Sequence, residues 1–314
     1  MKIWGPRASG RLPISLHHTE RSGLAWALAG FVLLSTGDAV IKSIAGAWAP
    51  TAIAATRYVL GAAGLGLLLA WREGREGFAM PSPALQALRG FGVAIATLGF
   101  FSAVFLMPLA EATAITFTSP MITALLSALF LGEPARRETW LASVLAFVGM
   151  LIVLRPNLAE LGLAALLPLL SAIGMSLLMI GNRAVAGKAS ALASQFFVAI
   201  MAAPLLVVAT FLGTFTSEPR LAVAVPDWTI LARCAVVAVS ASAAHWAIFK
   251  GTARAGAAAI APMTYVQLLV ATVLGIVLFN DWPDGPTLFG SALIVGAGLW
   301  LWRAGARQAA HEAR

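Results

Sequence analysis

The sequence predicts an all-α membrane protein of ten transmembrane helices, arranged as two inverted repeats of five helices each. The composition is 60% hydrophobic and only 11% charged, with a mean hydropathy of +0.88. Soluble domains are about a quarter charged. Apolar segments long enough to cross a bilayer follow one another along most of the chain. Lysines and arginines fall almost entirely in alternate loops, as in multi-pass membrane proteins.

Ten apolar segments predict the ten helices. Their expected bounds are 24–44, 51–71, 88–107, 111–131, 139–154, 161–181, 190–212, 228–249, 256–279 and 287–303. The fifth and the tenth are short, near the lower limit for a span. The first is expected to be retained rather than cleaved as a signal peptide, because many apolar segments follow it. Residues 1–23 and 304–314 are expected to be cytoplasmic tails.

Basic residues set the expected orientation. Of the 21 lysines and arginines, only Arg155 and Arg220 fall in loops of one side, whereas Lys42, Arg57 and Arg233 lie in or at the ends of spans. The remaining 16 lie in the tails and in the loops of the other side. That side is cytoplasmic by the positive-inside rule, so both termini of this inner-membrane (plasma-membrane) protein are expected in the cytoplasm. The net charge of +8 therefore needs no nucleic-acid partner.

The two halves of the chain resemble each other. Matching tracts are Lys42-Ser-Ile-Ala-Gly46 with Arg183-Ala-Val-Ala-Gly187, and Leu131-Gly-Glu-Pro134 with Phe279-Asn-Asp-Trp-Pro283. Five helices per half is an odd number, so the second half enters the membrane from the opposite side and the repeats are inverted. We expect the repeats at 24–156 and 157–303, with a substrate site between them near the membrane midplane. Chance similarity between apolar helices is the alternative.

Several tracts also indicate a family. They are Ala54-Ala-Thr-Arg-Tyr58, Ala110-Glu-Ala-Thr-Ala114, Pro120, Leu131-Gly-Glu133 and Val148-Gly-Met-Leu-Ile-Val-Leu-Arg-Pro156. Over roughly residues 24–303 the chain resembles the drug/metabolite transporter superfamily, of the type with two EamA domains. The tract 109–115 is also similar to bacterial carriers of S-adenosylmethionine or riboflavin. The second half departs from the family pattern, because Asn280-Asp281 stands where Gly-Glu is usual.

The predicted fourth helix combines hydroxyl side chains with an internal proline. Thr116, Thr118 and Ser119 surround Pro120 within the apolar run. A proline inside a span frees backbone groups, which need a cavity or neighbouring side chains to satisfy them. These three residues are therefore candidates for lining a substrate cavity. The alternative is an ordinary kinked span whose hydroxyls bond back to their own backbone.

Charged residues inside a bilayer are costly, so each one is a candidate for function. Asp38 and Lys42 are four residues apart on one face of the first helix, so they are candidate partners. Asp38 is a candidate proton- or cation-responsive carboxylate in the cavity. Lys42, Arg57 and Glu111 are candidates for a gate of ion pairs, with Asp38 or Glu111 as the partner of Arg57. The alternatives are a fixed structural tie for Arg57, snorkelling for Lys42 and helix capping for Glu111.

Further polar and aromatic candidates lie in the eighth and ninth segments. A free histidine titrates near neutral pH, so His245 is a candidate proton relay. Trp246 beside it is suited to stack on a flat or cationic substrate. Tyr265 and Gln267 are expected to add polar lining to the same cavity. Hydrogen bonding between helices is the alternative for His245.

The sequence has no enzyme signature. It lacks a phosphate-binding Walker sequence, a His-Glu-x-x-His zinc helix and a Gly-x-Ser-x-Gly elbow. With Cys234 as the only cysteine, neither an intrachain disulfide nor a cysteine metal site is expected. We therefore predict no catalysis, no cofactor and no metal, and no pumping driven by ATP.

The leading hypothesis is a secondary carrier of a small organic metabolite that works by alternating access, driven by protons or by exchange. An amino-acid or drug exporter is an alternative within transport. A membrane scaffold or sensor that keeps a carrier fold without transport is an alternative from another class, and a channel is weakened by the lack of a ring of charges. The expected partners are the lipid bilayer and the small substrate. The spacing of Ala292 and Gly296 also fits a homodimer, although packing inside the bundle explains it as well.

Overall fold

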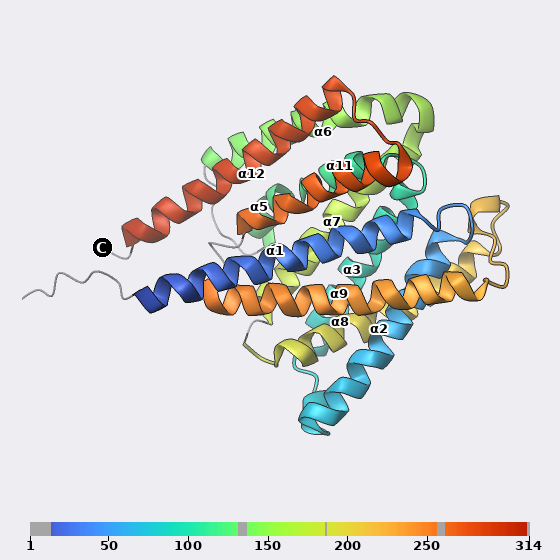
Figure 1. Ribbon diagram of the computed structural model, residues 1–314, viewed down its shortest axis with the longest axis horizontal. Coiled ribbons are helices and arrows are strands. Elements are labelled where there is room, and N and C mark those ends of the chain that lie inside the picture. The colour runs from blue at the N-terminus through green and yellow to red at the C-terminus, as the bar shows by residue number, and fades with distance from the viewer. Residues whose placement is uncertain (1–13, 131–136, 186, 256–260, 313–314) are drawn as a thin grey trace, which may run out of the picture.

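The computed structural model describes residues 14–130, 137–185, 187–255 and 261–312, and every regular element in these ranges is helical (Figure 1). The elements are α1 (Ile14–Lys42), α2 (Pro50–Glu73), η1 (Glu76–Phe78), α3 (Pro83–Val104), α4 (Leu109–Thr116), α5 (Ser119–Phe130), α6 (Arg137–Leu161), η2 (Gly162–Leu166), α7 (Leu167–Ala184), α8 (Ala191–Gly213), η3 (Pro219–Leu221), α9 (Trp228–Ala255), η4 (Ala261–Tyr265), α11 (Val266–Phe279) and α12 (Gly285–Glu312). The tract Leu131–Pro134 of the predicted repeat lies outside the described residues.

Eight helical segments in the described residues are long and apolar enough to cross a membrane. They are Ser22–Lys42, Pro50–Glu73, Pro83–Val104, Leu109–Leu126, Leu158–Asn182, Ala191–Gly213, Trp228–Gly251 and Gly285–Ala304. Two shorter apolar helices, Trp140–Arg155 and Met263–Phe279, fall at the predicted fifth and ninth segments. The tenth segment was expected to be short, but it extends over 20 residues because the helix begins earlier and ends later than its apolar run. The chain is therefore a multi-pass membrane protein.

The helices pack in pairs. The most extensive helix packing is between α1 and α9, and α3 packs on both α7 and α8. The pair α6 and α12 forms one edge of the bundle, and α2 packs on α8 at the opposite edge (Figure 1). The broken helices α4 and α11 contact each other between these pairs.

Glycines allow close helix crossings, among them those of α1 with α9 and of α7 with α3. A Cβ atom on Gly30 of α1 would lie 2.7 Å from Ala244 O of α9. A Cβ atom on Gly174 of α7 would lie 2.5 Å from Gly92 O of α3. Because real Cβ atoms do not approach oxygen this closely, the helices reach these separations only with glycine at both positions.

The predicted break at Pro120 and a second break at Pro262 both fall where the chain changes helix. The predicted fourth helix is interrupted between α4 and α5, directly before Pro120. The ninth segment begins with the 3₁₀ turn η4, which contains Pro262, before α11 starts at Val266. The ring of Phe117 at the first break packs edge to face on that of Tyr265 at the second, with centroids 5.7 Å apart. The two broken helices therefore meet at their interruptions.

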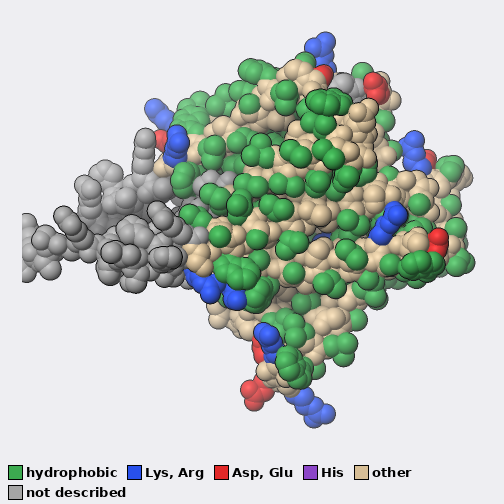
Figure 2. Space-filling view, in the orientation of Figure 1, with side chains coloured by type: hydrophobic (Ala, Val, Ile, Leu, Met, Phe, Trp, Pro, Cys, Tyr) green, Lys and Arg blue, Asp and Glu red, His purple; other side chains and the backbone are tan. Residues whose placement is uncertain are grey.

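The described start of α1 and the C-terminal end of α12 lie at the same end of the bundle (Figure 1). Figure 2 shows that most charged side chains of the visible face lie towards its edges, while hydrophobic side chains cover much of its middle. Such a distribution suits a protein surrounded by lipid at mid-height and by water at both ends.

Candidate functional site

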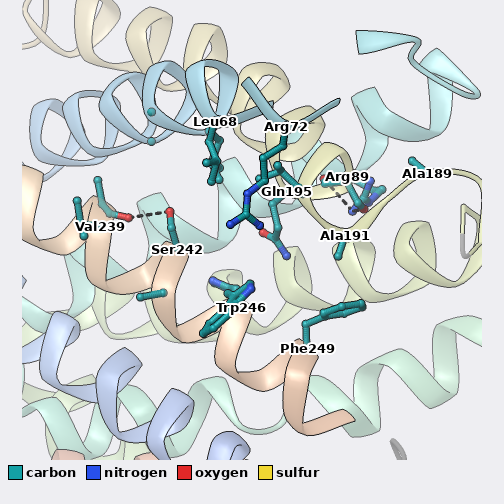
Figure 3. Close-up of a pocket in the computed structure, with 18 of the residues that line it drawn as sticks. Leu68, Arg72, Arg89, Ala189, Ala191, Gln195, Val239, Ser242, Trp246 and Phe249 are labelled. Atoms are coloured by element: carbon teal, nitrogen blue, oxygen red, sulfur yellow. Dashed lines mark hydrogen bonds between the residues drawn. The ribbon is translucent and has the colours of Figure 1, made fainter. Parts of the chain in front are cut away.

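A cavity of about 870 Å³ opens between helices α2, α3, α7, α8 and α9 (Figure 3). It follows the second half of α2, from Leu60 to Arg72, and α9 from Ala235 to Phe249. Gly61 and Gly64 of α2 line it, and a Cβ atom on either would meet nothing within 4 Å. The volume falls in the range of about 300–1,000 Å³ that is typical of small-molecule sites.

The polar groups of the cavity gather beside the C-terminal end of α2 and the N-terminal ends of α3 and α8. They include Arg72, Arg89, Asn182, Ser194 and Gln195. Figure 3 shows Arg72 and Gln195 extending into the same part of the cavity, with Trp246 across from them. This end can therefore offer hydrogen-bond donors and positive charge to a ligand.

Arg89 is buried in the wall of this end, with only 3% of its surface exposed. Its Nε donates to Asn182 Oδ1 at 2.7 Å, and its two terminal nitrogens donate to Gln86 Oε1 and, at 2.8 Å, to Ser194 Oγ. Gly181 makes room for the side chain, because a Cβ atom there would lie 2.5 Å from Arg89 Cγ. The guanidinium thus ties α3 to α7 and α8 through neutral groups.

His245 and Trp246, both predicted for the cavity, line it. His245 Nδ1 lies 2.7 Å from Ala241 O. A carbonyl only accepts, so Nδ1 carries the proton and Nε2 of the neutral ring is left as an acceptor. The Lys250 ammonium lies 4.0 Å from the ring centroid of Trp246 and 4.7 Å from that of Trp26. The Lys250 ammonium therefore already packs against one face of the Trp246 ring as a cation–π contact.

Arg57 connects the first helix to the cavity electrostatically. Its charge acts on Asp38 of α1 and on His245 of α9. Its guanidinium packs over the rings of Tyr58 and Phe101, at 5.0 and 5.5 Å from their centroids. In the part of the chain that the structure describes, no carboxylate lies within 4 Å of Arg57, so the expected ion pair with Asp38 or Glu111 is not formed. The described lining of the cavity does not include Asp38.

Lys42 pairs with a different carboxylate from the one expected. Its Nζ lies 2.5 Å from Asp281 Oδ2 and donates to Met107 O at 3.0 Å. Asp38, one turn earlier on the same helix, is not its partner, because the loop between α11 and α12 brings Asp281 to the end of α1. Both side chains of the pair are largely buried, at 12% and 21% exposed. The contact joins α1, the turn before α4 and the turn after α11.

Glu111 lies in the first turn of α4 and is 8% exposed. Its Oε1 accepts from the hydroxyl of Thr287 in α12 at 3.4 Å. The N-cap residue of α4 is Pro108, so Glu111 is the third residue of the helix, where the positive end of the helix dipole favours an anion. It therefore links α4 to α12.

The hydroxyls near Pro120 bond to backbone carbonyls rather than line the cavity. Thr116 donates to Ala112 O at 2.9 Å, and Thr118 donates to Ile115 O at 2.8 Å. The carbonyl of Ser119 accepts from Ser176 of α7 at 2.9 Å. The bonds of Thr116 and Thr118 are those of the alternative interpretation, in which hydroxyls bond back to their own backbone.

Tyr265 and Gln267 lie at the break before α11, also away from the cavity lining. Tyr265 packs on Phe117, and its hydroxyl occupies the space beside Gly298 of α12. The carbonyl of Gln267 accepts from Ser35 Oγ of α1 at 3.0 Å. Both residues thus connect helices in the middle of the bundle.

Sequence reasoning missed Arg72, Arg89 and Gln195. The two arginines were counted only as basic residues of a cytoplasmic loop, although the structure places both in helices that border the cavity. A signal was present for Arg89, which lies six residues inside the helix after Pro83. Nothing in the sequence distinguished Gln195.

Comparisons with known proteins agree with a membrane carrier. Residues 21–155 match the EamA-like transporter family. The chain is 27% identical over 287 residues to the S-adenosylmethionine uptake transporter of Rickettsia bellii, covering 90% of this chain and 94% of that protein. It is 27% identical over 195 residues to the riboflavin transporter of Vibrio cholerae, covering 60% and 61%. A solved crystal structure with 20% identity matches with a TM-score of 0.60 over 92% of this chain and 99% of that one, which supports the fold alone.

The family match and the relatives point to a membrane transporter. The family match over residues 21–155 and these relatives support the resemblance of the chain to the drug/metabolite transporter superfamily.

Proposed function

We propose that this protein is a secondary carrier that moves a small organic metabolite across the inner membrane by alternating access. The observation that carries the proposal is that the bundle contains an open cavity at one end and a largely buried ion pair at the other. The cavity lies beside the C-terminal half of α2, and the Lys42–Asp281 pair lies by the N-terminal end of that helix. An alternating-access carrier needs one open and one closed end.

The helix pairing supports two inverted repeats at 24–156 and 157–303, with ten spans. We pair α1 with α7, α2 with α8, α3 with α9, α4 with α11 and α6 with α12. When each helix is replaced by its counterpart in the other repeat, the contact between α1 and α9 becomes a contact between α7 and α3, which the structure also contains. The same replacement turns the contact of α3 with α8 into that of α9 with α2, and it leaves α6–α12, α2–α8 and α4–α11 in place. Repeats related by a two-fold axis have this property.

The close crossings support the same exchange residue by residue. Gly30 of α1 approaches Ala244 O of α9, and Gly174 of α7 approaches Gly92 O of α3. The two glycines are 144 positions apart in the sequence, and the two residues that they approach are 152 positions apart. At a second pair of crossings, Gly251 approaches Gly23 O and Gly99 approaches Leu167 O. The same sequence separations return: residues 99 and 251 are 152 positions apart, and residues 23 and 167 are 144 positions apart. Chance similarity between apolar helices gives no reason for repeated offsets.

The charge distribution supports an orientation. Most basic residues lie in the tails and in the loops at the cavity end, which would therefore be cytoplasmic. The cavity would then open inwards, while Lys42, Asp281 and Met107 close the outer side. Asp38 and His245, both within the field of Arg57, are the groups we propose for coupling transport to protons.

The names of the relatives suggest the first substrates to test. We propose counterflow in proteoliposomes preloaded with S-adenosylmethionine, riboflavin, aromatic amino acids or small amines, one at a time. A labelled trace of the same compound is added outside, and vesicles without protein serve as the control. Accumulation with one compound would support a carrier. Binding of a compound without any flux would instead support the scaffold or sensor.

A further inference from the structure

The charged side chains that line the cavity are all basic. Arg72 and Arg89 line its cytoplasmic end, and the described lining residues include neither Asp nor Glu. Glu73, next to Arg72 in sequence, accepts from Ser190 Oγ at 2.7 Å and is not part of the lining. A ligand in the cavity therefore meets positive charge without a compensating carboxylate.

Arg89 is the fixed part of this charge. Its hydrogen-bond partners Asn182, Gln86 and Ser194 are neutral, and in the described ranges no carboxylate lies within 4 Å of it. Burying a charge without an opposite charge is costly, and a ligand anion in the same wall would offset that cost. The three hydrogen bonds hold the guanidinium in one place whether or not a ligand is bound.

Arg72 is the accessible part. It is exposed, lies in the last turn of α2 and extends into the cavity beside Gln195 (Figure 3). An arginine fork and an amide N–H together match the two oxygens of a carboxylate or phosphate group. The residues that could contact the ligand thus come from two neighbouring helices, α2 and α8.

A purely cationic ligand is disfavoured by the same groups. The Lys250 ammonium occupies a face of Trp246, and Trp26 packs edge to face on the Trp246 ring with centroids 5.5 Å apart. Stacking of a cation on Trp246, as expected from the sequence, would bring that cation close to Lys250. Like charges in a site of reduced dielectric repel each other.

We propose that Arg72 and Gln195, with the fixed charge of Arg89 behind them, form a subsite for an anionic oxygen group of the transported molecule, a carboxylate or a phosphate. This inference rests on the proposed carrier function and adds the class of substrate to it. The rest of the molecule would lie along the apolar wall from Leu60 to Leu68.

The test uses pairs of probes that differ in the anionic group. Riboflavin 5′-phosphate carries a phosphate that riboflavin lacks. S-adenosylhomocysteine carries a carboxylate that 5′-methylthioadenosine lacks, together with an ammonium, so the phosphate pair isolates the effect of the anion. Binding to the full chain in neutral detergent is measured by thermal stabilisation. We expect at least one anionic probe to bind more tightly than its partner. Arg72→Gln should weaken that probe by about tenfold to a hundredfold and leave the uncharged partner unchanged.

The matched control is Arg75→Gln, which removes an exposed arginine three residues away that does not line the cavity. Arg72→Lys keeps the charge without the fork and should weaken binding less than Arg72→Gln. Arg72 is exposed, so neither variant should affect folding. Equal binding of both members of each pair, or binding of neither, would overturn the subsite.

Two further readouts distinguish the subsite from lipid binding and from the carrier function itself. If Arg72→Gln changes only the response to phosphatidylglycerol in phosphatidylcholine vesicles, the arginines bind lipid headgroups and the subsite is refuted. If counterflow occurs but does not distinguish the probe pairs, the carrier stands and the subsite fails. If an anionic probe binds through Arg72 but no compound is transported, the subsite stands and the carrier function fails.

Discussion

Lys42 Nζ lies 2.5 Å from Asp281 Oδ2, although 239 residues separate the two along the chain. The pair joins the end of α1 to the turn after α11, and Met107 O accepts a second hydrogen bond from the same ammonium. Both side chains are mostly buried. Removing one partner would leave the other charge in a poorly solvated place, which is unfavourable.

We therefore expect Lys42→Met and Asp281→Asn each to destabilise the protein, and the double variant to be less destabilised than their sum. The expected coupling free energy is about 1–2 kcal/mol, measured by a double-mutant cycle of thermal unfolding in detergent. The exposed pair Arg220–Glu218, 3.9 Å apart, is the matched control and should show a coupling near zero. Equal coupling in the two cycles would contradict a special role for Lys42.

The sequence predicted the all-helical fold and the eight long apolar helices of the described residues, because bilayer thickness sets the length of a span and hydropathy marks it. Tertiary partners were harder. The helical spacing of Asp38 and Lys42 indicated a local pair, but the chain brings in Asp281 from a distant loop, which spacing within one helix cannot reveal. The sequence match between the halves also gave a slightly different offset from the helix packing. Residues 42 and 183 of the matched tracts are 141 positions apart, whereas the equivalent glycines Gly30 and Gly174 are 144 positions apart.

The cavity was predicted only in part for a similar reason. His245 and Trp246 stood out as polar or aromatic residues inside an apolar segment. Thr116 and Thr118 stood out equally, yet their hydroxyls bond back to carbonyls of their own segment, Ala112 O and Ile115 O. Whether a hydroxyl faces its own helix or a cavity depends on rotation of the helix within the bundle, and packing sets that rotation.

Gly298 is expected to tolerate no side chain. A Cβ atom there would overlap the hydroxyl of Tyr265, which is fixed by its contact with Phe117. We predict that Gly298→Ala destabilises the protein by about 1–3 kcal/mol through overpacking, measured as a fall in the melting temperature. Gly296 lies in the same helix with nothing within 4 Å, so Gly296→Ala should be neutral or slightly stabilising. Similar losses for both variants would refute the steric explanation.

Gly296 also bears on the expected homodimer. Both Ala292 and Gly296 are exposed on α12, so packing inside the bundle does not cover them. The homodimer stays a prediction.

Asp284 should make α12 sensitive to acid. Its Oδ1 accepts from the backbone N–H of Thr287 at 2.8 Å, as an N-cap residue does. Hydrogen bonding by Thr287 lowers the pKa of Asp284 below its ordinary value. A lowered pKa in the folded protein means that the stabilisation is present above the unfolded pKa, near 4, and is lost as pH falls through the folded pKa.

Asp284 is exposed, so the effect should be small, about 0.5–1 kcal/mol. Asp284→Ala should remove it at neutral pH. Asp284→Asn keeps a capping oxygen that does not titrate, so its stability should change less than that of the natural protein between pH 5 and about 3. Melting temperatures across this range measure the difference, and parallel curves for the two proteins would contradict the assignment.

Asp38 is the carboxylate we expect to couple transport to protons. It lies in the first span, and the nearby charge of Arg57 also acts on His245 in the cavity. Because Asn cannot exchange a proton, Asp38→Asn should lower proton-driven uptake by about tenfold or more, or remove its dependence on pH, while the protein still inserts and folds. Counterflow, which needs no proton gradient, should be affected less than uptake. Asp227→Asn, at an exposed acid before α9 where Asn also suits an N-cap, is the matched control. Natural rates with natural pH dependence in Asp38→Asn would exclude Asp38 from coupling and leave His245 as the remaining candidate on the cavity wall.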